Sequence, residues 1–207
     1  MNTDTIETND GVRLEAILEV PNNPTGTLVL CHPHPQQGGT MRTPILHEIK
    51  KHALATGLVV LRFNFRGVGA STGSYDNGEG EVRDVAAAMS RAESLDHTPV
   101  ALSGWSFGAA IALRWQASAG SRATYVGIAP PVGNELAPEL PRADELEPAR
   151  RRFIVGARDQ LVDVDALTSY AGSIGATIDI FRSSDHFFLS RRERLAQDVV
   201  AYVNDDD

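Results

Sequence analysis

The clearest signal in this chain is the stretch Val100-Ala101-Leu102-Ser103-Gly104-Trp105-Ser106-Phe107-Gly108-Ala109-Ala110. Its apolar first half predicts a short buried strand, and its small last residues predict the start of a helix. Between them, Gly104-x-Ser106-x-Gly108 predicts a tight turn that holds a serine in a strained backbone conformation. In this setting the motif indicates a nucleophile elbow, which presents the Ser106 hydroxyl above the edge of a sheet. The plainer interpretation is a glycine-rich turn whose serine only caps the helix, so partner residues elsewhere must decide.

The length of 207 residues predicts a single domain over 1–207, with frayed ends at 1–10 and 204–207. A formal net charge of -8 argues against nucleic acid and anionic membranes as partners, because both need a basic face. The polar start of the chain lacks the apolar region of a signal peptide. Since no apolar run approaches the roughly 18 residues of a membrane span, we expect a cytoplasmic protein.

Apolar runs bounded by glycine and proline alternate with stretches of helical spacing along the chain. Strands are predicted at 12–20, 27–31, 58–63, 100–103, 124–128, 153–156 and 177–181. Helices are predicted at 43–56, 79–95, from the elbow to about 119, 163–174 and 190–203. This alternation predicts the α/β class, with a mainly parallel central sheet covered by helices on both faces. The functional site of such a sheet lies beyond the carboxyl ends of its strands.

A serine nucleophile needs an adjacent base, and the base needs a carboxylate that orients it. His186 is the best candidate for the base, because it lies in the loop after the last predicted strand. Asp159 is the best candidate for the carboxylate, since it follows the end of the preceding strand by three residues. Other carboxylates fit less well, because they open the next helix or adjoin the base itself: Asp163, Asp165 and Asp185.

The negative charge that develops on a substrate oxygen needs backbone N–H donors held in place. We expect the first donor to be the N–H of Phe107, the residue after the nucleophile. We expect the second from His34, because the prolines on either side of it have no N–H, and Gln36 is the alternative. Side chains beside these groups are candidates for lining the pocket: His32, Trp105 and Phe187.

Metal and thiol chemistry are weaker interpretations of the same loop. His32 and His34 form a His-x-His pair, but the sequence offers no further ligand cluster, so we expect no metal and no cofactor. Cys31 ends a predicted buried strand, where an inert packed thiol is the better interpretation than a nucleophile.

Four passages combine into a wider pattern: residues 31–40, with Cys31-His32-Pro33-His34-Pro35, residues 61–73, with Arg66-Gly67-Val68-Gly69, then Gly104–Gly108 and Asp185-His186-Phe187-Phe188. Together they resemble the α/β-hydrolase superfamily, in particular its small, lidless bacterial branch related to dienelactone hydrolases and Xaa-Pro-dipeptidyl-peptidase-like esterases. The resemblance implies a single-domain α/β-hydrolase fold without a substantial lid. It also implies a cofactor-free serine hydrolase whose triad, in the chain order Ser, Asp, His, is Ser106, Asp159 and His186.

These residues predict cleavage of a carboxylic ester or thioester through an acyl-enzyme on Ser106. Many relatives insert a lid between the sixth and seventh strands, but here that interval, 129–152, is short and rich in proline. We therefore expect a small-molecule substrate with a small or short acyl chain. A short-peptide hydrolase and a catalytically silent binding protein on the same fold are the alternatives.

Overall fold

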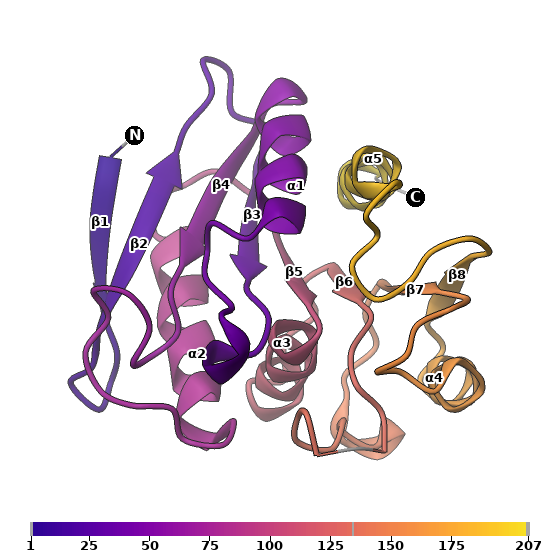
Figure 1. Ribbon diagram of the computed structural model, residues 1–207. Coiled ribbons are helices and arrows are strands. Elements are labelled where there is room, and N and C mark those ends of the chain that lie inside the picture. The colour runs from indigo at the N-terminus through magenta and orange to yellow at the C-terminus, as the bar shows by residue number, and fades with distance from the viewer. Residues whose placement is uncertain (1, 134, 206–207) are drawn as a thin grey trace.

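Eight strands form one sheet in the computed structural model, which describes residues 2–133 and 135–205 (Figure 1). The order across the sheet is β1-β2-β4-β3-β5-β6-β7-β8. Strand β2 is antiparallel to both of its neighbours, β1 and β4, and the six strands from β3 to β8 are parallel to one another. The strands are β1 (Asn2–Glu7), β2 (Arg13–Glu19), β3 (Gly26–Cys31), β4 (Leu58–Phe63), β5 (Val100–Trp105), β6 (Tyr125–Ile128), β7 (Arg151–Gly156) and β8 (Thr177–Phe181).

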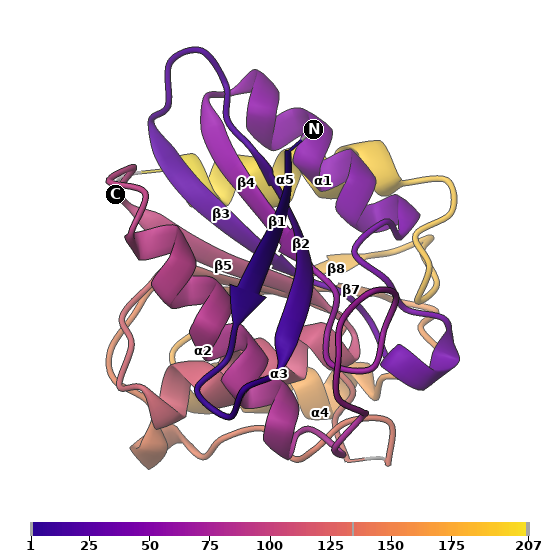
Figure 2. The same ribbon diagram turned by 90° about the vertical axis from the view of Figure 1, so that its left-hand side faces the viewer.

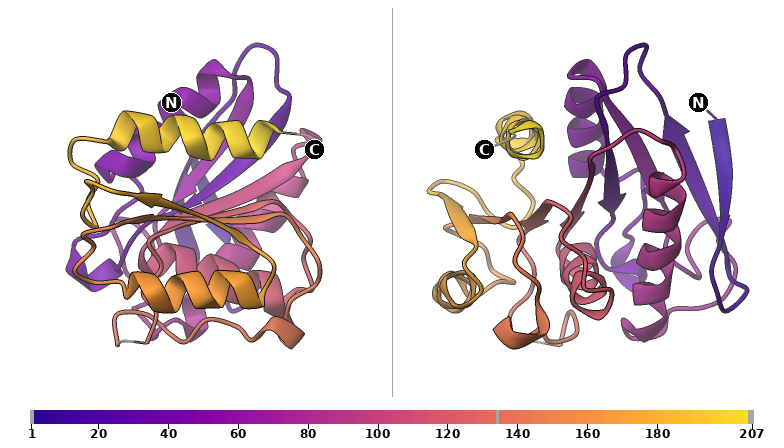
Figure 3. Two further views of the ribbon diagram at one scale, coloured as in Figure 1. Left: turned by 90° about the vertical axis from the view of Figure 1, so that its right-hand side faces the viewer. Right: turned by 180° about the vertical axis from the view of Figure 1, so that it is seen from behind.

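In the described part of the chain, five α-helices cover the two faces of this sheet (Figure 3). One face carries α1 (Pro44–Ala55) and α5 (Arg192–Asn204). The other carries α2 (Glu79–Glu93), α3 (Phe107–Ser118) and α4 (Val164–Ser173). The α/β class, the mainly parallel sheet and the helices on both faces are confirmed.

The central strands are buried along their whole length because helices pack on both of their faces. Every residue of β3 and β4 is buried, which explains their near-continuous apolar sequences. Helix α3 is also buried, from Phe107 through Leu113. A helix apolar on nearly all sides is typical of the middle of a domain, and its first turn is therefore fixed firmly at the end of β5.

The N-terminal segment corrects one expectation from the sequence. Residues 1–10 were expected to be frayed, but β1 pairs with β2 in unbroken register, from Asn2 opposite Leu18 to Glu7 opposite Arg13 (Figure 2). Ile6 is the one large apolar side chain that β1 buries. The backbone ladder, rather than an apolar stripe, therefore holds this strand.

The expected fraying at 204–207 is also wrong for its first residue. Asn204 is the last residue of α5, and its side-chain amide donates to the Thr56 hydroxyl at 3.1 Å. Residues 206 and 207 lie outside the described part of the chain.

The segment from β6 to β7 contains little regular structure in its described residues, apart from a 3₁₀ turn at Ala143–Glu145. Arg114 of α3 donates to the Glu139 carbonyl at 3.3 Å, and the Tyr170 hydroxyl donates to the Pro141 carbonyl at 2.7 Å. These bonds hold the segment alongside α3 and α4, as expected for a fold without a substantial lid. No helix in residues 2–133 and 135–205 is long and apolar enough to cross a membrane.

Candidate active site

Ser106 lies on the turn between β5 and α3, at a φ of 56° and a ψ of -124°. Residues other than glycine rarely adopt this combination of φ and ψ, so the surrounding structure must impose the conformation. The Ser106 N–H donates to the Ile128 carbonyl at 2.7 Å, and its carbonyl accepts from the N–H of Ala109 at 2.9 Å. These bonds connect the turn to β6 on one side and to the first turn of α3 on the other.

The two glycines of the motif are explained by close backbone approach. A Cβ on Gly104 would lie 2.5 Å from the carbonyl carbon of Gly108. A Cβ on Gly108 would lie 2.3 Å from the carbonyl oxygen of His32. Backbone atoms at these distances cannot give way as a flexible side chain could. The glycines therefore let α3 begin directly against the ends of β5 and β3, which positions Ser106 at the edge of the sheet.

The structure brings His186 and Asp159 together from two separate loops. The Asp159 carboxylate oxygens lie 2.9 and 3.1 Å from His186 Nδ1, and both side chains are buried. One of these oxygens also accepts the N–H groups of Leu161 at 2.9 Å and Val162 at 3.0 Å. Because an ionised carboxylate can only accept, the proton of a neutral imidazole lies on Nδ1. The lone pair of Nε2 is then left to act as a base.

The other carboxylates considered from the sequence have different partners. Asp163 caps α4, because its Oδ1 accepts from the N–H of Ala166 at 3.0 Å. Asp165 lies in the first turn of the same helix. Asp185 accepts the N–H of Phe187 at 3.0 Å. Each is thus used locally, whereas Asp159 reaches the imidazole.

Two aromatic residues predicted to line the pocket lie beside His186. The Trp105 indole N–H donates to the His186 carbonyl at 3.2 Å, and the centroids of these two rings are 5.6 Å apart. The Phe187 ring packs edge-on against the imidazole, also at 5.6 Å, and remains 47% exposed. Trp105 therefore holds the histidine loop in place, while Phe187 presents an apolar surface at the site.

The two residues predicted to carry the oxyanion donors are in contact through their rings. The His34 ring packs on the Phe107 ring with centroids 5.0 Å apart, and Phe107 is the first residue of α3. A first-turn N–H has no partner within its own helix, so the Phe107 N–H can serve a substrate. The Gln36 N–H, the alternative second donor, donates instead to His34 Nδ1 at 3.2 Å.

Tyr75 joins this ring cluster and was not predicted from the sequence. Its hydroxyl lies 3.3 Å from His34 Nε2, and its ring centroid lies 5.1 Å from that of His34. The only signal in the sequence is an aromatic residue just beyond the glycine-rich loop that follows β4.

His32 lies in the interior, where its ring packs edge-on against Phe65, which in turn contacts Phe107. Its ring is fully buried, with Nε2 accepting the Phe65 N–H at 3.0 Å and Nδ1 lying 2.6 Å from the Pro33 carbonyl oxygen. Burial lowers the pKa of His32 from 6.5 to about 4, so the ring is neutral at pH 7. His32 therefore connects the loops after β3 and β4 and presents no free nitrogen to a pocket.

Cys31 is fully buried, and burial raises the pKa of its thiol well above the usual value. The thiolate, which is the reactive form, is thereby disfavoured. In residues 2–133 and 135–205, no group of three or more His, Cys, Asp or Glu side chains is arranged to hold a metal ion.

The model of the alpha/beta hydrolase family matches residues 28–203. The chain belongs to this family. The sequence is 34% identical over 194 residues to an uncharacterized protein of Rickettsia prowazekii (strain Madrid E), covering 88% of this chain and 79% of that protein.

Two solved structures resemble this alpha/beta hydrolase over nearly its whole length. A serine hydrolase without a lid from Xanthomonas campestris has a TM-score of 0.86 at 28% identity, covering 98% of this chain and 93% of that one. A serine hydrolase homologue from Coxiella burnetii has a TM-score of 0.82 at 30% identity, covering 97% and 96% of the two chains. Family and neighbours together support hydrolase activity.

The glycine-rich passage with Arg66-Gly67-Val68-Gly69 forms the loop after β4 of this alpha/beta hydrolase, and side-chain and backbone bonds fix that loop. Arg66 is buried and pairs with Asp84 at 2.8 Å and with Asp10 at 3.0 Å. The Thr72 N–H donates to the Arg13 carbonyl at 2.8 Å, which attaches the loop to the start of β2. The arginine of this passage is therefore used in ion pairs that hold the loop.

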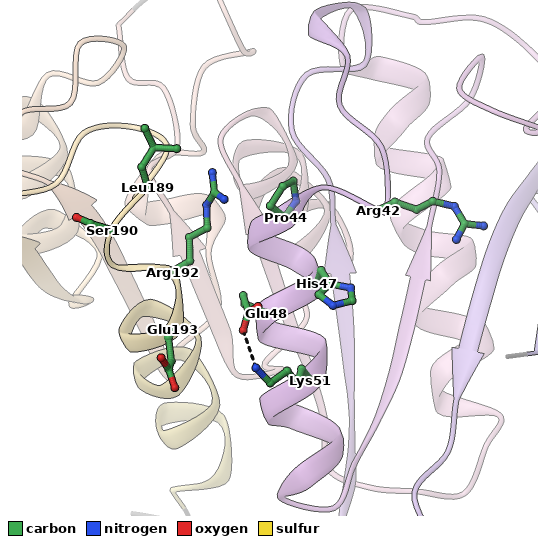
Figure 4. A pocket seen from close by; sticks show the side chains of 9 residues that line it. All are labelled: Arg42, Pro44, His47, Glu48, Lys51, Leu189, Ser190, Arg192 and Glu193. Atoms are coloured by element: carbon green, nitrogen blue, oxygen red, sulfur yellow. Dashed lines mark hydrogen bonds and ion pairs between the residues drawn. The ribbon is translucent and has the colours of Figure 1, made fainter.

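A groove of about 510 Å³ begins at Leu189, three residues beyond His186, and lies between the first turns of α1 and α5 (Figure 4). Charged side chains dominate its lining, and Lys51 pairs with Glu48 at 3.3 Å. Its walls are Arg42, Pro44, His47, Glu48, Lys51, Leu189, Ser190, Arg192 and Glu193.

Proposed function

We propose that this alpha/beta hydrolase cleaves small carboxylic esters or thioesters through an acyl-enzyme on Ser106. The observation that carries the proposal is the contact of 2.9 Å between His186 Nδ1 and the buried Asp159 carboxylate. It occurs at the sheet edge where Ser106 begins α3 in its strained conformation. A nucleophile, a base and an orienting carboxylate at one edge are the parts that acyl transfer to water needs.

In the proposed reaction, His186 Nε2 removes the Ser106 hydroxyl proton as the oxygen attacks the substrate carbonyl carbon. The N–H groups of Phe107 and His34 then donate to the oxyanion of the tetrahedral intermediate. The protonated imidazole gives its proton to the departing alcohol or thiol, which leaves the acyl group on Ser106. Water, deprotonated by the same nitrogen, attacks the acyl-enzyme and releases the carboxylic acid.

The neighbours support the serine-dependent part of this proposal. The Xanthomonas campestris protein is described as a serine hydrolase without a lid, and the Coxiella burnetii protein as a serine hydrolase homologue. At 28% and 30% identity, with nearly complete coverage, they favour the same use of Ser106 here.

A small substrate is supported by what surrounds the site. The bonds of Glu139 and Pro141 hold the segment between β6 and β7 against α3 and α4, where it cannot enclose a long acyl chain. We therefore expect kcat/KM for p-nitrophenyl esters to fall as the acyl chain grows beyond a few carbons. A maximum at long-chain esters would contradict this.

Labelling with a fluorophosphonate tests the nucleophile directly. The native protein should react with one equivalent of the probe, because an activated serine attacks phosphorus as it attacks a carbonyl. Ser106→Ala should not be labelled although its circular dichroism spectrum is unchanged, and Cys31→Ser should be labelled like the native protein. A native protein that resists the probe would instead favour a silent binding protein.

A further inference from the structure

A small pocket of about 210 Å³ lies where the loop from β8 enters α5. Its lining is Phe181, Arg182, Ser183, Ser184, Arg191 and Arg194. Three of these six residues are arginines, in a chain whose formal net charge is -8. Positive charge is therefore gathered at this point of an otherwise acidic molecule.

Ser184 is the buried polar residue of this pocket. It is only 4% exposed, and its hydroxyl oxygen has no hydrogen-bond partner among the described residues. Its backbone groups are used, because its N–H donates to the Phe181 carbonyl at 3.0 Å and its carbonyl accepts from the Arg158 N–H at 2.9 Å. The hydroxyl is thus the polar group of Ser184 that is left without a partner among the described residues. A buried hydroxyl without a partner destabilises the fold, so a bound acceptor would relieve that cost.

The positive charge of the pocket's arginines is only partly neutralised by carboxylates of the described residues. In residues 2–133 and 135–205, no carboxylate lies within 4.0 Å of the side-chain nitrogens of Arg182 or Arg191. Arg194 uses Nε for Asp198 at 2.8 Å, which leaves the terminal nitrogens of its guanidinium group for another acceptor.

The helix that starts here adds a second source of positive potential. Helix α5 is 13 residues long, and no side chain within residues 2–133 and 135–205 caps its N-terminus. Unpaired N–H groups and the helix dipole favour an anion at such an end. The acidic residue of its first turn, Glu193, lines the groove toward α1 instead (Figure 4).

We propose that this pocket binds a phosphate group. A phosphate dianion offers several acceptor oxygens, which match the forked donors of guanidinium groups and the single donor of Ser184. The group has two sources, free inorganic phosphate or the phosphate of a phosphorylated substrate. Either would act close to the catalytic loop, because Ser184 precedes His186 by two residues.

Calorimetric titration with inorganic phosphate, in a chloride buffer at constant ionic strength, tests the site without turnover. The native protein should bind one equivalent, and Arg182→Gln should weaken binding tenfold or more, since it removes a charge-assisted donor. Arg122→Gln is the matched control, because it removes one charge from an exposed arginine outside the pocket and should bind like the native protein. No saturable binding up to about 10 mM phosphate, or equal weakening by both variants, would overturn the proposal.

Ser184→Ala separates a ligand site from a simple packing defect. Without phosphate, its melting temperature should equal or exceed that of the native protein, because an unpartnered buried hydroxyl is removed. With phosphate, the native protein should gain melting temperature and the variant should gain less. The same gain in both proteins would show that the hydroxyl does not face the ligand, and would contradict the site as assigned.

Kinetics identify the source of the phosphate. If free phosphate is the ligand, it should change the turnover of neutral p-nitrophenyl acetate, and Arg182→Gln should abolish that change. If the substrate carries it, the neutral ester should be unaffected, whereas phosphate should compete with a phosphorylated ester. Binding by Ser106→Ala protein should persist in both cases, so failure of the proposed hydrolase activity is distinguishable from failure of this site.

Discussion

At the scale of single residues, the carboxylates around His186 differ in what their oxygens accept. Asp159 accepts from the imidazole and from two backbone N–H groups, whereas Asp163 accepts from the start of α4. Asp159→Asn should lower kcat about 10⁴-fold, because an amide favours the wrong imidazole tautomer. Asp163→Asn is the matched control. It should lower stability by no more than about 1 kcal/mol and leave kcat unchanged, as steady-state assays and thermal melts can check.

Two substitutions of His34 distinguish the role of its backbone N–H as an oxyanion donor from the role of its side chain. Its φ of -49° suits proline, so His34→Pro should keep the loop and remove the N–H. We expect a loss of about a hundredfold or more in kcat, the scale for one oxyanion donor. His34→Ala keeps the N–H and should retain appreciable activity.

Circular dichroism and melting temperature must show that both variants are folded. If His34→Ala is as inactive as His34→Pro, the imidazole or its contact with Tyr75 is what catalysis needs.

Sequence patterns predicted Ser106, Asp159 and His186 as a triad, because the carboxyl ends of parallel strands meet at one edge of the sheet. They did not indicate Tyr75 or the interior position of His32, since neither depends on a local pattern. His32 accepts a backbone N–H from the loop after β4, and that contact joins residues 33 positions apart. Contacts between loops of this kind are set by the whole packing.

At the scale of elements, the position of α3 depends on the space beside Gly108. A methyl group there would meet the carbonyl oxygens of His32 at 2.3 Å and Cys31 at 2.5 Å, so Gly108→Ala must move α3 away from β3. We expect a loss of about 3 kcal/mol or more in the free energy of unfolding. In the fraction that folds, kcat should fall about a hundredfold, because Ser106 is displaced.

Gly172→Ala provides the control within another helix. A Cβ there meets no atom of the described residues within 4 Å, so alanine should raise the free energy of unfolding by roughly 0.5–1 kcal/mol. Chemical denaturation of both variants measures these changes, and a Gly108→Ala protein as stable as Gly172→Ala would contradict the steric argument.

Most element boundaries could be predicted from the sequence to within one or two residues, as the identical ranges for β4 and β8 illustrate. Strand β1 could not, because a sequence with one apolar residue, Ile6, gives neither alternation nor a buried run. Strand β1 is held by its backbone pairing with β2, and the sequence of β1 alone does not reveal that pairing.

At the scale of the whole molecule, the buried neutral His32 makes stability depend on pH. Its pKa is lowered from 6.5 to about 4 in the folded chain, so between these values the unfolded chain binds one more proton. Stability should therefore decline as the pH falls through this window, by up to about 3 kcal/mol from this group.

The comparison of His32→Gln with the native protein isolates this contribution, since the carboxylates titrate alike in both. Denaturant melts between pH 7 and pH 4 should show a shallower decline for His32→Gln, although its absolute stability is lower. His47→Gln changes an exposed histidine and should follow the native slope. Parallel slopes for all three proteins would exclude His32 as the cause.

The strained backbone of Ser106 lowers the thermal stability of the folded protein. A non-glycine residue at a φ of 56° and a ψ of -124° stores about 1–3 kcal/mol of backbone strain, which the rest of the fold must offset. Ser106→Gly relieves the strain that Ser106→Ala retains, and the freer unfolded chain offsets only about 0.5–1 kcal/mol of that gain. The glycine variant should therefore melt about 2–4 °C higher for each net kcal/mol gained. Activity and endurance then compete at this one position, and a chain selected only for heat resistance would discard its nucleophile.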